Sequence, residues 1–116
     1  MNRSLTVYLQ DVLESCELII KYIKPVSADE FRTNTELQDA VIRRFEIIGE
    51  AIKHVPNVLR EKYPKIEWKK AAAFRDILAH DYPEIIIDDV YHTSRNHLPE
   101  FREQIASVLN DLQKYK

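Results

Sequence analysis

Three side chains in the segment 74–83 have types and spacings that suit the chemistry of phosphate esters. Arg75 carries a permanent planar cation whose donors form a fixed fork, which matches a phosphate group. His80 follows five residues later, and its imidazole can give or take a proton near neutral pH. Tyr82 stands two residues further on, before Pro83. A base that takes the proton of a 2′-hydroxyl, beside a cation that stabilises the charge on phosphorus, is the minimum equipment for cutting RNA without a metal.

The surroundings of these residues sharpen that hypothesis. The pattern Arg-x4-His-x-Tyr, with Trp68 seven residues before Arg75, resembles the signature of the HepT-like toxins, small members of the HEPN nuclease superfamily. A second stretch, residues 40–51, is similar to the family's second long helix with its Ile-Gly-Glu-Ala end. The resemblance extends over residues 5–105, nearly the whole chain.

The resemblance implies a metal-independent endoribonuclease with no cofactor, acting on RNA (mRNA or tRNA) through catalytic Arg75 and His80. It also implies a symmetric homodimer whose paired motifs line a shared cleft. In type VII toxin–antitoxin pairs of this kind, a small nucleotidyltransferase antitoxin transfers AMP to the motif tyrosine, here Tyr82. One departure is Asp76, a supporting position where many members carry Asn. Its charge beside Arg75 is expected to weaken phosphate binding.

The composition indicates one ordinary soluble globular domain spanning residues 1–116, with 45% hydrophobic and 31% charged residues. No apolar run approaches the length of a membrane span, and the N-terminal residues lack the features of a signal peptide. The single cysteine, Cys16, excludes an internal disulfide. It is expected to be a buried structural thiol, which fits a cytoplasmic location.

The charge is unevenly distributed. A net charge of −2 does not favour nucleic-acid binding over the whole surface. Residues 53–75, however, carry seven Lys or Arg against two acids, whereas residues 76–90 carry five acids and no Lys or Arg. A basic stretch is often only a solvated helix face. Because this one leads into Arg75, Lys69 and Lys70 are candidate contacts to the RNA backbone.

Apolar side chains recur at three- and four-residue steps, which predicts an all-α, HEPN-type bundle of four main helices plus short helical turns. The main helices are expected at residues 4–24, 35–55, 67–81 and from 90 to the C-terminus. The third of these carries the motif, and its apolar members are Trp68, Ala71, Ala72, Phe74, Ile77 and Leu78.

Shorter features punctuate these helices. Ser27 and Glu30 fit a capping box for a short turn anchored by Phe31, and another short helix is expected at residues 57–63. The last helix is expected to begin after a cap at residues 88–89. Pro99 lies within that helix and should kink it, because proline has no N–H to donate.

Gly49 is the only glycine in the chain and lies inside the second predicted helix. A glycine within a helix costs roughly 1 kcal/mol relative to alanine. Close approach of another helix, in the same chain or across a dimer, is the expected compensation. The small residues 71–73 would also allow a close helix contact, so their helix is placed near the dimer axis. Glu50 has two open alternatives, namely pairing with an inward-facing basic side chain or exposure to solvent.

The motif does not assemble on one regular helix. At about 100° per residue, Arg75 and His80 lie roughly 140° apart around the axis. Pro83 also disfavours helical geometry at Tyr82. The helix end must therefore unwind, or two chains must complete the site. The negative end of the helix dipole and Asp76, four residues before His80, both favour the imidazolium form, which suits proton donation to the leaving 5′-oxygen.

Two other interpretations stay open. The chain could be a non-catalytic helical subunit that binds and assists a small nucleotidyltransferase, or a plain helical dimerisation module. A histidine at the end of a helix can also be a simple cap or core residue. No metal site is expected, because His54, His92 and His97 lack ligand partners at suitable spacing, and the last two should be surface groups.

Overall fold

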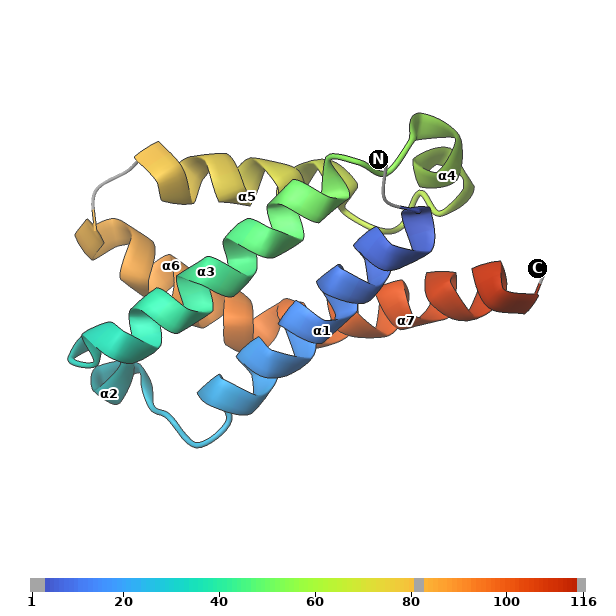
Figure 1. The fold of residues 1–116 in the computed structure, drawn as a ribbon. Helices are drawn as coiled ribbons and strands as arrows, with labels where there is room; N and C mark the ends of the chain where they lie inside the picture. The colour runs from blue at the N-terminus through green and yellow to red at the C-terminus, as the bar shows by residue number, and fades with distance from the viewer. Residues whose placement is uncertain (1–3, 81–82, 115–116) are drawn as a thin grey trace.

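A computed structural model describes residues 4–80 and 83–114, and these form seven α-helices and no strand (Figure 1). The helices are α1 (Leu5–Ile23), α2 (Ala28–Arg32), α3 (Thr35–Ile52), α4 (Asn57–Lys62), α5 (Trp68–His80), α6 (Pro83–Asn96) and α7 (Leu98–Lys114). The all-α prediction is confirmed, and the predicted bounds of the first three long helices are close to those observed.

The long helices pack around α1 and α3. These two helices lie side by side through the middle of the molecule, with α7 against α1 and α5 against α3 (Figure 1). Helix α6 runs behind α3 and also contacts α1 and α2. Helix α5 therefore depends on α3 for its position, since α3 is the helix it contacts most extensively.

Side chains at the helix starts explain several of these bounds. The Ser4 Oγ accepts a hydrogen bond from the Val7 N–H at the start of α1 (3.3 Å). The predicted capping box is present: the Glu30 N–H donates to Ser27 Oγ (3.1 Å) and the Ser27 N–H donates to Glu30 Oε1 (3.0 Å). Phe31 is fully buried, as expected for the anchor of this turn.

The C-terminal third differs from the sequence prediction. The predicted cap at residues 88–89 is wrong, because Asp88 and Asp89 lie inside α6, which begins at Pro83. Proline is well tolerated at the first position of a helix, where its missing N–H has no intrahelical partner to lose. Pro83 therefore starts a helix seven residues earlier than the expected start at residue 90.

The kink expected at Pro99 is a complete break. Pro99 is the second residue of α7, and α6 ends at Asn96. Because Pro99 cannot donate to the carbonyl of Arg95, the helical hydrogen-bond ladder is interrupted there. The single predicted helix is thus two helices, and the predicted four main helices become five long ones accompanied by α2 and α4.

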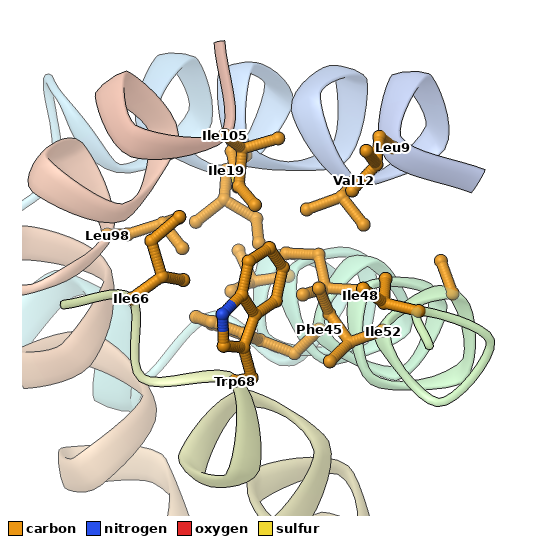
Figure 2. Packing of buried hydrophobic residues seen from close by; sticks show 14 of the residues in the cluster. Leu9, Val12, Ile19, Phe45, Ile48, Ile52, Ile66, Trp68, Leu98 and Ile105 are labelled. Carbon is orange, nitrogen blue, oxygen red and sulfur yellow. The ribbon is translucent and has the colours of Figure 1, made fainter. Parts of the chain in front are cut away.

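The core lies where α1, α3, α5 and α7 meet. In Figure 2, Trp68 of α5 points up toward Ile19 of α1 and Ile105 of α7, with Phe45 and Ile48 of α3 to one side of its ring. Cys16 is fully buried, which confirms the prediction of a structural thiol, and burial raises the pKa of that thiol to about 12. Within the described residues, every helix is too short or too polar to cross a lipid bilayer.

Candidate active site on α5

Helix α5 is anchored at its amino end by Trp68. This indole is only 4% exposed, and its Nε1–H donates to the Tyr63 carbonyl oxygen (3.1 Å). Burying an aromatic side chain of this size is one of the larger single contributions to a small core. In the middle of α5, Ala71 and Ala72 are half-buried and pack against the hydrophobic core. The small residues thus pack against α3, as their size led us to expect.

Gly49 is the place where α3 and α5 come closest. A Cβ atom at position 49 would overlap the Cβ of Arg75 and would lie 2.9 Å from its Cγ and 3.5 Å from the Ala71 carbonyl oxygen. The absence of a side chain at this position therefore lets the stem of Arg75 lie directly on the α3 backbone. The expected close approach at Gly49 is confirmed, and its partner belongs to the same chain.

Arg75 is held by two carboxylates. Its Nη2 lies 2.8 Å from Glu50 Oε1, and its Nη1 lies 3.3 Å from Asp76 Oδ1. The same Asp76 oxygen lies 3.0 Å from Lys53 Nζ. Of the two alternatives for Glu50, pairing with a basic side chain is therefore the correct one. These four residues, called here the Arg75 network (Glu50, Lys53, Arg75 and Asp76), carry charges that sum to zero.

The guanidinium of Arg75 retains unused donors. Arginine has five N–H groups; the Asp76 carboxylate accepts a hydrogen bond from Nη1, and Glu50 forms an ion pair with Nη2. The Nε is buried and has no hydrogen-bond partner among the described residues. Both terminal nitrogens keep N–H groups that are not used in a hydrogen bond among the described residues, and the side chain is 32% exposed. Arg75 can therefore donate hydrogen bonds to a phosphate while it stays paired with Glu50 and Asp76.

Asp76 is an ionised member of this network. The hydrogen bond from Lys53, followed by that from Arg75, lowers the pKa of its carboxyl below the ordinary value of 3.8. The negative charge of Asp76 was expected to weaken phosphate binding at Arg75. Lys53 partly neutralises that charge by pairing with the same carboxylate. The half-exposed positions of Asp76 and Lys53 keep this interaction in contact with solvent and salt.

The rest of the motif stands at the carboxyl end of α5. The helix ends at His80, so Asp76 and His80 share one helix with the expected four-residue spacing. The side chain of His80 and all of Tyr82 lie outside the described residues. Their catalytic and modification roles stay predictions.

The basic stretch that precedes Arg75 is partly structural. Lys53 belongs to the Arg75 network, and Arg60 donates to the carbonyl oxygens of Ile52 and Val55 at the end of α3 (2.8 and 3.1 Å). Lys70 pairs with Glu67 at 2.8 Å. Of the two lysines predicted to contact RNA, Lys70 thus has a carboxylate partner, and Lys69 is exposed.

A cavity of about 450 Å³ borders α5 and is lined by residues of α3, α5 and α7. Its apolar lining includes Phe45, Ala73, Phe74, Ile77 and Phe101, and Lys70, His97 and Glu100 contribute polar groups. Ile77, one of the apolar members of this helix, lines the cavity and is 46% exposed.

The remaining histidines do not gather acidic or sulfur ligands. Among the described residues, no group of three or more His, Cys, Asp or Glu side chains could hold a metal ion. His92 and His97 are exposed, which confirms that they are surface groups, and their rings meet edge-on at 5.4 Å. His54 stacks on Tyr8 with ring centroids 4.2 Å apart.

Comparisons with known proteins agree with this arrangement. The family model described as "Ribonuclease HepT-like" matches residues 12–108. A "Gamma-glutamylcyclotransferase and putative RNase" of Methanocaldococcus jannaschii is 43% identical over 116 residues, and the chain spans 52% of that protein. A "Putative RNase" of the same organism is 36% identical over 113 residues, covering 97% of both chains.

A third relative carries the family name itself. The "Probable ribonuclease HepT" of Thermococcus cleftensis is 35% identical over 108 residues, which cover 93% of this chain and 98% of the relative. No solved structure matches the chain significantly. The matched region contains α3, α5 and the whole Arg75 network. The chain therefore belongs to the HepT-like ribonuclease family.

Proposed function

We propose that the chain is a cytoplasmic, metal-independent endoribonuclease that acts as the toxin of a type VII toxin–antitoxin pair. The observation that carries the proposal is the state of Arg75, a pre-positioned cation with unused donors five residues before His80. Membership of a ribonuclease family supports the same reaction class. The substrate is RNA, because the proposed chemistry needs a 2′-hydroxyl as the internal nucleophile.

The proposed reaction is an internal displacement at phosphorus. The 2′-hydroxyl loses its proton and its oxygen forms a bond to phosphorus, while the bond from phosphorus to the 5′-oxygen breaks. The leaving oxygen takes a proton from a histidine, and the products carry a 2′,3′-cyclic phosphate and a 5′-hydroxyl. Arg75 stabilises the charge that builds on the phosphoryl oxygens. In a dimer, the two copies of His80 can divide the two proton transfers between them.

A symmetric homodimer is part of this proposal. Positions 75 and 80 lie about 140° apart around the axis of an ideal helix, and α5 extends to position 80, so two chains side by side could bring the two residues together. Ile77 of the same helix is exposed and lines the apolar cavity, so this side of α5 offers apolar surface to a second chain. Light scattering at micromolar concentration should give the mass of two chains. A monomer that cleaves RNA at full rate would contradict the shared cleft.

Cleavage of a fluorescent RNA by the purified protein tests the reaction. Arg75→Ala and His80→Ala should each abolish cleavage, with the circular dichroism spectrum and Tm retained. Asp39→Asn, which neutralises an exposed carboxylate on α3 outside the network, should behave as wild type. EDTA should have no effect, and the products should carry a cyclic phosphate. Full activity of either alanine variant, or complete inhibition by EDTA, would overturn the assignment.

The proposed off switch is AMP transfer to Tyr82 by a nucleotidyltransferase antitoxin. Each AMP adds a bulky anion two residues after His80, which should repel RNA phosphates. Tyr82→Phe should leave the nuclease active and indifferent to the antitoxin. Intact-mass spectrometry after incubation with the nucleotidyltransferase and ATP measures this. An equal gain of AMP units on wild type and on Tyr82→Phe would mean that another residue is modified.

One observation favours a second candidate, a non-catalytic subunit that assists the nucleotidyltransferase. Arg75 is already paired with two carboxylates, and the Arg75 network carries no net charge. Expression of the chain alone separates the two candidates. The nuclease should arrest growth and His80→Ala should relieve the arrest, whereas the assisting subunit should be harmless in both forms. A plain dimerisation module would leave Arg75 without a role.

A further inference from the structure

We propose that Glu50 is a positioning residue for the cleavage reaction, which fixes the orientation of the Arg75 guanidinium before RNA binds. This inference rests on the proposed nuclease function and adds a residue from a different helix to it. Glu50 Oε1 lies 2.8 Å from Nη2 of Arg75, whereas the Asp76 carboxylate approaches the other terminal nitrogen at 3.3 Å. The shorter of the two contacts that hold the guanidinium is thus the one to Glu50.

Glu50 acts together with its neighbour Gly49. The stem of Arg75 lies on the α3 backbone at Gly49, and one residue later α3 supplies the carboxylate that binds the head. A long, flexible side chain is thereby fixed at two points by consecutive residues of one helix. Because the side chain of Arg75 is already fixed in the free protein, less conformational entropy is lost when RNA binds.

The geometry leaves room for a substrate oxygen. Asp76 accepts one N–H of Nη1 and Glu50 forms an ion pair with Nη2, so further N–H groups of the two terminal nitrogens are available to a phosphate. The Nε–H is buried and is not needed for this contact. Glu50 therefore directs the guanidinium without occupying all of its donors.

Positioning and simple charge repulsion predict opposite results. Removing the charge of Glu50 leaves the Arg75 network with a net charge of +1, which by electrostatics alone would tighten RNA binding and speed cleavage at low RNA concentration. If Glu50 instead orients Arg75, its removal lowers kcat without raising KM, because the lost interaction matters only in the transition state.

The kinetic test compares Glu50→Ala, Glu50→Gln and the control Asp39→Asn with wild type. Glu50→Ala should lower kcat about tenfold or more, since a misplacement of about 1 Å can cost about a hundredfold. Glu50→Gln should recover most of the rate, because its amide oxygen can occupy the same place beside Nη2. Asp39→Asn removes an equal charge from the same helix and should change nothing. An unchanged or raised kcat in Glu50→Ala would overturn the proposal and leave the nuclease assignment intact.

A second measurement does not depend on turnover. The ¹H–¹⁵N signal of the Arg75 Nε–H, assigned by its loss in Arg75→Lys, should exchange slowly with water because the Nε is buried. Glu50→Ala should speed that exchange about tenfold or more, and Asp39→Asn should not. If the wild type fails to cleave RNA, this exchange rate still decides whether Glu50 fixes Arg75. Equal exchange in wild type and Glu50→Ala would disprove it.

Discussion

The two ends of α5 are held by different forces. At the amino end, Trp68 is 4% exposed and lies in the core between α1, α3 and α7. At the carboxyl end, Arg75 is 32% exposed and Ile77 is 46% exposed. Apolar burial anchors the first end, whereas a close backbone approach and ion pairs hold the second.

This difference separates stability from the proposed chemistry. Apolar burial depends little on salt and pH, so the Trp68 end should persist over a wide range of conditions. Ion pairs near the surface are screened by salt and altered by protonation. The groups proposed to meet RNA thus stand at the end of α5 whose contacts are more sensitive to salt and pH, and three substitutions can test the contrast.

Trp68→Ala should have the largest effect on folding. Truncation of a buried aromatic side chain to alanine typically costs about 3–5 kcal/mol in the free energy of unfolding, because it leaves a cavity. Urea titration followed by circular dichroism measures this change. Val58→Ala serves as the control, since Val58 is 81% exposed, and it should stay within about 0.5 kcal/mol of wild type. A similar loss in both variants would show that Trp68 is not the anchor.

Gly49→Ala should have the next largest effect on the free energy of unfolding, and it should act at the carboxyl end of α5. Helix propensity alone would favour alanine by about 1 kcal/mol. The overlap with the Cβ of Arg75 should instead destabilise the fold by about 1–3 kcal/mol, as overpacking does, and should displace Arg75.

Combining Gly49→Ala with substitutions of Arg75 tests whether the overlap with the Arg75 Cβ causes the loss of stability. The penalty should persist with Arg75→Ala, which keeps the Cβ, and should disappear with Arg75→Gly, which removes it. Urea titrations of the six proteins, each background with and without Gly49→Ala, measure this. A stabilised Gly49→Ala protein would mean that α3 and α5 do not approach closely at this point.

The smallest effect concerns the protonation of Asp76. Its folded pKa lies below the ordinary 3.8, so the stabilising contribution is present above about pH 4 and is lost as the pH falls through the folded value. Lys53→Met removes the largest cause and should raise the pKa of Asp76, as followed by NMR titration of the carboxyl carbon. Lys70→Met is the matched control because Lys70 pairs with Glu67. An equal rise in both variants would rule out the Lys53 contact.

Local signals in the sequence were sufficient for much of the fold. Helical periodicity located α1, α3 and α5, and the Ser27–Glu30 pattern identified a capping box that forms within four residues. Pro99 illustrates the limit of such signals. A proline near a helix start is neutral and one inside a helix is disruptive, and only the packing of α6 and α7 decides which applies.

The candidate site was predictable in its residues and not in its contacts. Arg75 and Asp76 follow from the motif, but Lys53 lies 23 positions before Asp76, and no local pattern joins them. Gly49 signalled a close contact without naming the partner, and Glu50 was equally compatible with solvent. These contacts are set by the packing of α5 on α3, which is a property of the tertiary structure.

The burial of Cys16 makes the chain a convenient host for chemical probes. With the pKa of its thiol at about 12, almost none is present as reactive thiolate at neutral pH. A cysteine introduced on the surface could therefore carry a spin label or fluorophore while Cys16 stays in place. Alkylation of Cys16 itself requires α1 to separate from its neighbours, so its rate reports how often the molecule opens.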